Sequence, residues 1–279
     1  MLHFKRLNDR PTSLDVEKRD LALWPHLEQK TLPRSGPFSG RRQILKTIRP
    51  RNLPSSILAD MKISVLQHSD GTPPGSVSTW AAQSGHQLDL RRLHLGDQLP
   101  DLNSTDLLVI LGGPMNVDDL ELFPWLADEK RYLKTAIEIG VPCVGLCLGG
   151  QLLAQTLGAR VQKNSHWEVG WHPVTLENAQ SLTVFQWHQD CFELPPGAER
   201  IARNAITENQ AFRFGKKTLG FQFHPEATPE WVKECSEDQD YPVGPFVHNP
   251  AEIIAGVIQL PTMQRWFFNI LDSLTGSKT

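Results

Sequence analysis

Apolar runs and segments of helical periodicity alternate along the chain from residue 61 onward. Continuous apolar runs such as DLLVILGG and VPCVGL are typical of strands buried on both faces of a sheet. In PWLADEKRYLKTAIEIG, Pro124 suits a first helical position and Gly140 a helix end. We expect strands at 62–68, 87–93, 106–113 and 141–146, and helices at 75–85, 124–140 and 149–158. This alternation predicts an α/β fold with a doubly wound, mostly parallel sheet and helices on both faces.

The pattern becomes strand-rich after residue 159, in the C-terminal half of the chain. We expect strands at 168–176, 181–188, 211–215 and 218–224, the last two joined by a hairpin-like turn. Helical periodicity returns from about residue 250 to about residue 274. Pro261 should break this helical region, because proline lacks the N–H group that a helix interior needs.

Residues 1–60 show no sustained period and contain scattered prolines and arginines. We expect this segment to be a disordered or non-native N-terminal extension, with the natural start at Met61. Its acidic residues are not typical of a transit peptide. The predicted organisation is therefore an extension over 1–60, a main domain over 61–240, and a helical extension over 241–279 that packs on the domain.

Charge and composition narrow the possible partners. The net charge is −3, yet residues 1–60 carry an excess of Lys and Arg and the remainder an excess of Asp and Glu. The basic segment lacks the interleaved aromatic residues of nucleic-acid-binding modules, and no apolar run is long enough to span a bilayer. We therefore expect a cytosolic protein with no nucleic-acid or membrane partner. The four cysteines show no CxxC spacing, so we expect reduced thiols, no metal site and no cofactor.

Cys147 stands between Gly145 and Gly149, where a predicted strand turns into a predicted helix. Glycines on either side of a nucleophile permit the strained turn of a nucleophile elbow, and the start of a helix favours the reactive thiolate. The Leu148 N–H would then point at the oxygen of a carbonyl under attack. The alternative is that Cys147 is a small buried residue, which is how we interpret Cys143 on the strand itself.

A base for such a thiol is predicted in the stretch GFQFHPEATPE. His224 should end a strand on the same face as Gln222, and Glu226 lies close enough in sequence to hold the imidazole. Cys147, His224 and Glu226 would then form a catalytic triad. The alternative, a plain strand terminus, becomes less attractive because the elbow is present as well.

A third stretch, VILGGPMNVDD, runs from a strand into Gly112-Gly113-Pro114. A glycine here can bring its N–H close to a reacting atom, so the Gly113 amide is a candidate second oxyanion donor beside Leu148. The alternative is an ordinary Gly-Gly-Pro turn.

Together these stretches resemble the class I, triad-type glutamine amidotransferases. The resemblance is carried, in order, by LGGPM at 111–115, GLCLGGQLLA at 145–154 and FQFHPE at 221–226. Three further stretches are similar to the stand-alone branch related to the glutaminase domain of GMP synthetase: EVGWHPV at 168–174, VFQWHQD at 184–190 and ENQAFRFG at 208–215. The resemblance covers roughly residues 61–231 and implies a flavodoxin-like fold.

The resemblance implies a glutaminase that works through a cysteinyl thioester, with L-glutamine as amide donor. By position in the family motif, Gln151 would contact the bound glutamine, and the backbone at Gln189 and Asp190 would hold its amino-acid end. Gln189 departs from the glycine often found in that segment, which leaves the form of the substrate site open. Four tryptophans are candidates to line its mouth: Trp167, Trp171, Trp187 and Trp231.

No P-loop and no ammonia-accepting domain is recognisable in the sequence. A glutaminase of this kind would need a partner, namely a separate synthetase subunit. The alternative is a γ-glutamyl peptidase or hydrolase with the same triad. A third hypothesis, of another class, is a non-catalytic regulatory or docking subunit.

Overall fold

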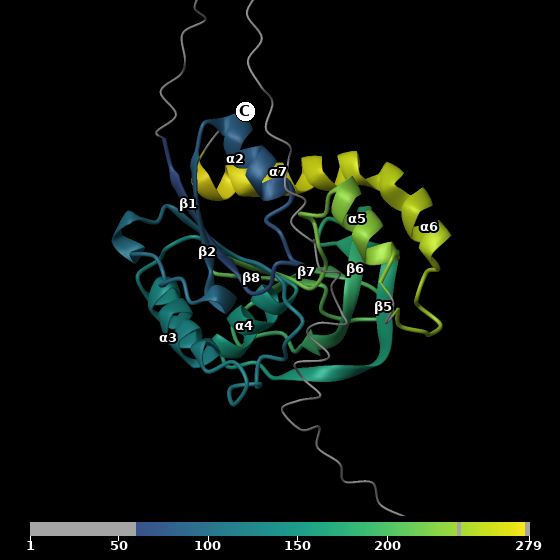
Figure 1. The fold of residues 1–279 in the computed structure, drawn as a ribbon, viewed down its shortest axis with the longest axis horizontal. Helices are drawn as coiled ribbons and strands as arrows, with labels where there is room; N and C mark the ends of the chain where they lie inside the picture. The colour runs from purple at the N-terminus through teal and green to yellow at the C-terminus, as the bar shows by residue number, and fades with distance from the viewer. Residues whose placement is uncertain (1–59, 239–240, 277–279) are drawn as a thin grey trace, which may run out of the picture. The chain divides into compact units, whose positions relative to one another are not determined.

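The computed structural model describes residues 60–238 and 241–276, so the expectation for residues 1–60 lies outside the described residues except at Asp60. Within them the strands form one nine-stranded sheet (Figure 1). Its order is β2 (Gln87–Arg92), β1 (Lys62–Gln67), β3 (Leu107–Ile110), β4 (Cys143–Leu146), β9 (Thr218–Phe221), β8 (Ala211–Phe214), β7 (Glu199–Arg203), β5 (Val161–Leu176) and β6 (Ser181–Phe192). The pairings from β2 to β9 are parallel, and those from β9 to β6 are antiparallel. The predicted α/β fold is confirmed, with its parallel part in the first five strands.

Helices cover both faces of this sheet. One face packs against α2 (Ser76–Ser84), α5 (Pro229–Ser236), α6 (Pro250–Ala255) and α7 (Leu260–Thr275), and the other against α3 (Trp125–Glu138) and α4 (Leu148–Thr156) (Figure 1). In β3, Leu107 and Val109 point into the hydrophobic core under α2, α5, α6 and α7. Leu108 and Ile110 point into the core under α3 and α4. This strict alternation is why the strand is apolar at every position.

The strand-rich part differs from the prediction in length and number of elements. β5 and β6 start or end several residues beyond the predicted 168–176 and 181–188, and their pairing shifts register between Lys163 and Glu168. β7 and α5 were not predicted. The β7 sequence ERIAR has charged residues at both ends and only two apolar residues, so it shows little of the hydrophobic pattern of a strand. The α5 helix is marked instead by its caps, with the Thr228 side chain accepting from the Trp231 N–H and Pro229 in the first turn.

Two predicted boundaries are wrong. β9 ends at Phe221 rather than at His224, because the chain leaves β8 there and the His224 N–H donates to Phe185 O of β6 at 2.8 Å. Pro261 does not break a helix. It lies in the first turn of α7, where no N–H is needed, and the change of direction comes earlier, in a 3-10 turn at Gly256–Gln259.

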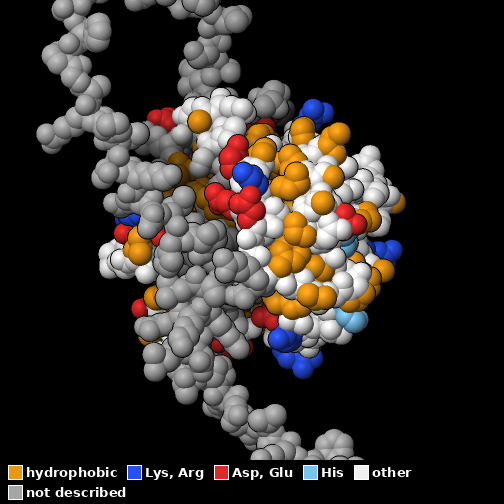
Figure 2. Space-filling view, turned by 45° about the vertical axis from the view of Figure 1, so that its right-hand side comes forward, with side chains coloured by type: hydrophobic (Ala, Val, Ile, Leu, Met, Phe, Trp, Pro, Cys, Tyr) orange, Lys and Arg blue, Asp and Glu red, His pale blue; other side chains and the backbone are white. Residues whose placement is uncertain are grey.

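The surface mixes apolar and charged positions. Figure 2 shows hydrophobic side chains gathered on the side of the molecule that carries α5 and α6, and the exposed Ile254 and Ile258 belong to α6 and to the 3-10 turn after it. Among the described helices, none is both long and apolar enough to traverse a bilayer.

Candidate active site

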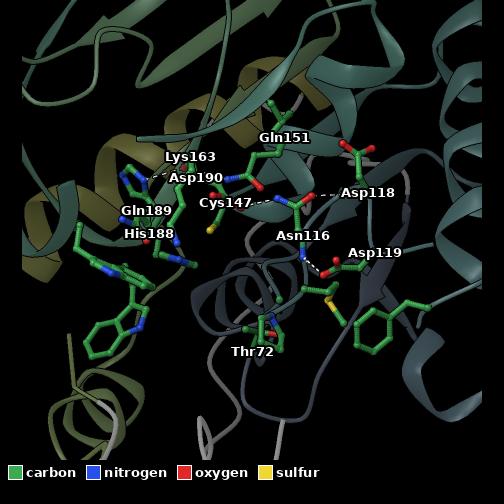
Figure 3. Close-up of a pocket in the computed structure, with 18 of the residues that line it drawn as sticks. Thr72, Asn116, Asp118, Asp119, Cys147, Gln151, Lys163, His188, Gln189 and Asp190 are labelled. Carbon is green, nitrogen blue, oxygen red and sulfur yellow. Dashed lines mark hydrogen bonds between the residues drawn. The ribbon is translucent and has the colours of Figure 1, made fainter. Parts of the chain in front are cut away.

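A cavity of about 720 Å³ opens where β3 and β4 end. Ligands of doubly wound sheets bind at such carboxyl ends. In Figure 3 the Cys147 sulfur lies near the middle, with Gln151 above it, Asn116 on one side and Gln189 on the other. The sequence-predicted residues that line the cavity are Gly113, Cys147, Gln151, Gln189, Asp190 and His224.

Cys147 occupies a strained turn between β4 and α4. Its φ of 51° is left-handed, a conformation that a non-glycine residue adopts only when the surrounding structure imposes it. A side chain at Gly145 would collide with the backbone of Gly149, and one at Gly149 with that of Ile110. The flanking glycines therefore let the turn pack against the sheet. Cys147 is 7% exposed and borders the cavity.

His224 and Glu226 lie next to this turn. The Glu226 Oε1 atom is 2.8 Å from His224 Nδ1, and both side chains are almost fully buried. Burial lowers the pKa of His224, but the charges of Glu226 and of the adjacent Cys147 outweigh it and raise this pKa to about 10. An imidazolium beside a cysteine sulfur stabilises its thiolate form.

The Gly112–Gly113 loop lies next to His224 and Cys147. A methyl group at Gly112 would lie 3.1 Å from His224 Cε1 and 3.6 Å from Cys147 Cβ. In the part of the chain that the structure describes, the amide N–H groups of Gly113 and Leu148 donate to no protein acceptor. Free N–H groups beside a nucleophile can bind a developing oxyanion.

The three predicted substrate-binding residues share one wall of the cavity. The Gln151 Nε2 atom donates to Asp190 O at 3.1 Å and to Gln222 Oε1 at 3.3 Å. The Asp190 carboxylate accepts from Asn116 Nδ2 at 2.6 Å. Gln189 donates to Asn164 O at 3.5 Å, so this wall is tied together before any substrate enters.

Three of the four tryptophans proposed for the mouth border the cavity: Trp167, Trp187 and Trp231. The prediction for Trp171 is wrong. Its ring is buried against Phe185, and its Nε1–H donates to Ile253 O at 2.8 Å, which ties β5 to α6. It has the same parity in β5 as Trp167, but it lies farther along the strand, where its ring packs against Gly256.

Sequence reasoning missed several polar residues of the site. Gln222 Nε2 lies 3.9 Å from Cys147 Sγ, and its place two residues before His224 was the available signal. Asn116 and Thr72 line the cavity from the segments after β3 and β1. Nothing local in the sequence marks Thr72, because only the fold brings its loop to the Gly112 carbonyl, 40 residues away.

A buried polar cluster supports the wall that carries Gln189 and Asp190. Glu168 accepts from Thr207 Oγ1 at 2.8 Å and from Gln210 Nε2 at 2.9 Å, and its carboxylate lies 3.4 Å from His188 Nε2. Burial raises the pKa of Glu168, but the His188 interactions and the donated hydrogen bonds bring it below the ordinary value. The cluster therefore holds the Glu168 carboxylate beside β6, the strand that carries Gln189 and Asp190.

The remaining cysteines lack the features of Cys147. Cys143 is fully buried, its sulfur contacts Val141 O at 3.3 Å, and burial raises its pKa to about 12. Burial also raises the pKa of Cys191 and Cys235. All four cysteines are free. Within the described residues, 60–238 and 241–276, no three His, Cys, Asp or Glu side chains converge as ligands for a metal ion.

Comparisons with known proteins agree on one family. The family model described as glutamine amidotransferase class-I matches residues 80–234. The glutamine amidotransferase-like protein YfeJ of Salmonella typhimurium is 28% identical over 236 residues, which cover 77% of this chain and 98% of YfeJ. A glutamine-hydrolysing GMP synthase subunit of Archaeoglobus fulgidus is 35% identical over 137 residues, 45% of this chain and 68% of that protein.

Solved structures give the same result. The glutamine amido transferase of Methylobacillus flagellatus superposes with a TM-score of 0.73 at 27% identity, over 79% of this chain and 96% of that one. A glutamine amidotransferase of Thermotoga maritima superposes with a TM-score of 0.72 at 26% identity, over 78% and 99%.

Proposed function

Because this chain belongs to the class I glutamine amidotransferase family, whose model matches more than half of it, we propose that it releases ammonia from L-glutamine through a thioester on Cys147. The observation that carries this proposal is the strained Cys147 turn facing the buried His224–Glu226 pair. The family accounts for amide transfer in general, and the residues of this cavity support the specific steps.

In the first step the Cys147 thiolate attacks the side-chain amide carbon of glutamine. The new C–S bond pushes the carbonyl electrons onto oxygen, where the N–H groups of Gly113 and Leu148 donate hydrogen bonds. The oxyanion then collapses, the C–N bond breaks, and the His224 imidazolium gives its proton to the departing nitrogen. Ammonia leaves and a thioester remains.

In the second step water hydrolyses the thioester. Neutral His224 takes a proton from water as the water oxygen attacks, and Glu226 stabilises the imidazolium that forms. Collapse of the second oxyanion expels the Cys147 thiolate and releases glutamate. Gln151, together with the backbone at Gln189 and Asp190, would hold the glutamine in place.

The ammonia then needs an acceptor. The Archaeoglobus relative is named for its place in GMP synthase, which supports the idea that the partner of this chain is a separate synthetase subunit. A cytosolic location, which keeps thiols reduced, belongs to the same proposal.

The test compares two cysteines four residues apart. The Cys147→Ala variant should lose ammonia release from glutamine, whereas the Cys143→Ala variant, altered in a thiol buried on the strand, should keep it. Ammonia and glutamate are measured together, since hydrolysis must yield equal amounts. Undiminished release by the Cys147→Ala variant would refute the proposal.

One observation favours a second candidate, a γ-glutamyl peptidase or hydrolase. A cavity of about 720 Å³ with tryptophans at its edge exceeds what the side chain of one small amino acid fills. Turnover of γ-glutamyl dipeptides is therefore measured beside turnover of glutamine. A higher kcat/KM for the peptides would favour the second candidate.

The non-catalytic docking role is tested on the same protein. Labelling of wild-type Cys147 by a glutamine-like alkylating agent, detected by mass spectrometry, supports an active site. Absence of labelling together with absence of turnover would favour the docking role.

A further inference from the structure

The carbonyl oxygen of Gly112 is held by two side chains from the segment after β1. Thr72 Oγ1 lies 3.0 Å from it, and His68 Nδ1 lies 3.1 Å from it. The same hydroxyl lies 3.1 Å from Ser69 O, so its single hydrogen is shared between two carbonyls and its rotamer is fixed. A loop carbonyl at the edge of a cavity is thus held from inside the protein rather than left to solvent.

His68 is itself immobilised by α3. Its Nε2 atom lies 3.0 Å from Glu129 Oε1, and both side chains are fully buried. Its ring stacks on Trp125, with centroids 5.6 Å apart and planes 16° apart, and Trp125 and Glu129 are one helical turn apart. Because a carbonyl oxygen can only accept, the Nδ1 atom that faces Gly112 O must carry a hydrogen. Glu129 therefore orients the ring so that Nδ1–H points at Gly112 O.

Gly112 O and the Gly113 N–H belong to the same peptide group. A trans peptide group is planar, so its N–H points opposite to its carbonyl. Holding Gly112 O toward His68 and Thr72 therefore directs the Gly113 N–H the other way. Glycine has no side chain to restrict rotation, so the orientation of this peptide depends on what its carbonyl contacts. The Gly-Gly unit lies here against His224 and Cys147, where a rotated peptide would remove the N–H from the reaction site.

We propose that His68 and Thr72 are positioning residues that lock the Gly112–Gly113 peptide with the Gly113 N–H directed at the oxyanion. This inference rests on the proposed glutaminase reaction for its kinetic consequence, but the orientation of the peptide itself does not depend on that reaction. Glu129 and Trp125 act one step further out, by holding His68.

The kinetic test replaces Thr72 with residues of similar size. Thr72→Val removes one donor, and we expect kcat for glutamine to fall roughly 3- to 10-fold with KM little changed, because the oxyanion exists only in the transition state. Thr72→Ser keeps the hydroxyl and should restore kcat. Thr105→Val is the matched control, since Thr105 is a buried threonine hydrogen-bonded to Ser64 at the opposite end of the strands.

The second kinetic test replaces both His68 and Glu129, so that neither residue is left buried without its partner. In the His68→Leu/Glu129→Leu variant, kcat should fall about 100-fold, the scale of losing one oxyanion donor. Alkylation of Cys147 by iodoacetamide, a substitution that forms no oxyanion, should keep its wild-type rate. If alkylation and turnover fall in parallel, or if the Thr72→Val variant turns over like wild type, the proposal is overturned.

A crystal structure of the Thr72→Val variant separates this inference from the proposed function. We expect the Gly112–Gly113 peptide to be rotated or present in two orientations, whereas in wild type one orientation is expected. An unchanged single orientation in both Thr72→Val and the double variant would overturn the inference even if glutamine turnover is established. A wild-type protein without glutaminase activity would refute the proposed function, while the peptide orientation would still be decided by the crystals.

Discussion

Two of the buried histidine–glutamate pairs in and around this site differ in what the second ring nitrogen faces. In the pair His224–Glu226 the ring adjoins the sulfur of Cys147. In the pair His68–Glu129 the ring donates to a backbone carbonyl. The two carboxylates lie 2.8 Å and 3.0 Å from their imidazoles, so the pairs themselves are nearly equivalent.

The difference shows that a histidine–carboxylate pair has no fixed role. A glutamate holds the ring and raises the pKa of the imidazole in both cases, against the effect of burial. Where the other nitrogen faces a nucleophile, the proton can move and the pair can act in chemistry. Where it faces a peptide carbonyl, the proton stays and the pair orients the backbone.

The largest effect is expected for His224→Asn. Removing the imidazole that interacts with Cys147 should lower kcat/KM for glutamine at least about 1,000-fold, because the departing nitrogen loses its acid. His68→Asn keeps an N–H near the Nδ1 position but leaves Glu129 buried without its partner. His224→Asn leaves Glu226 buried in the same way, so both variants should lose stability. His68→Asn should lower kcat/KM far less, because the imidazole beside Cys147 remains. Equal loss of turnover in both variants would erase the distinction between the pairs.

The next effect is expected for Glu226→Gln, on the order of a 100-fold loss of kcat/KM. Because the Glu226 charge raises the pKa of His224, to about 10 in wild type, its removal lowers that pKa. The alkaline limb of the pH–rate profile should therefore move to lower pH. Glu230→Gln, at an exposed glutamate on α5, is the matched control. A profile that does not move would contradict the role of Glu226.

Glu129→Gln should act on stability rather than on the pH–rate profile. Glu129 raises the pKa of His68 above its ordinary value of 6.5, so the stability that this pair adds is fully present below pH 6.5 and declines as the pH rises through the folded-state pKa. We expect wild type to exceed the variant by about 2 kcal/mol in free energy of unfolding at acidic pH, with a smaller difference at alkaline pH. Urea titrations across pH measure this. A difference that grows with pH would give the wrong sign.

The smallest effect is expected for Gln222→Leu. Its amide lies 3.9 Å from Cys147 Sγ, so its loss should reduce the iodoacetamide reactivity of Cys147 and kcat/KM by roughly 3- to 10-fold. Gln186→Leu is a control in an equally buried glutamine that bonds Gln210 instead. If both variants behave alike, the effect reflects packing and not the thiolate.

How far the sequence predicted this site depended on distance along the chain. The elbow around Cys147 was visible because its glycines are two residues away, and Glu226 because it is two residues from His224. Gln222 was noticed only as a neighbour on the same face. The contacts of His68 with Glu129, 61 residues away, and with Gly112, 44 residues away, had no local pattern to reveal them.

The same holds for the fold. Alternating apolar runs predicted the parallel strands, since burial on both faces requires every position to be apolar. The unpredicted β7 and α5, the early end of β9, and the burial of Trp171 follow from partners elsewhere in the chain: β5 and β8 for β7, Phe185 for His224, and Ile253 for Trp171.

The sequence by itself determined the strained thiol turn, the class of sheet and the family, because these depend on glycine freedom and on the period of apolar residues, which are local properties. Only the tertiary structure decided which ring faces the sulfur, which faces a carbonyl, and which tryptophans reach the cavity. The physical reason is that a hydrogen bond joins groups within about 3 Å in space, and the chain alone does not state which distant residues come that close.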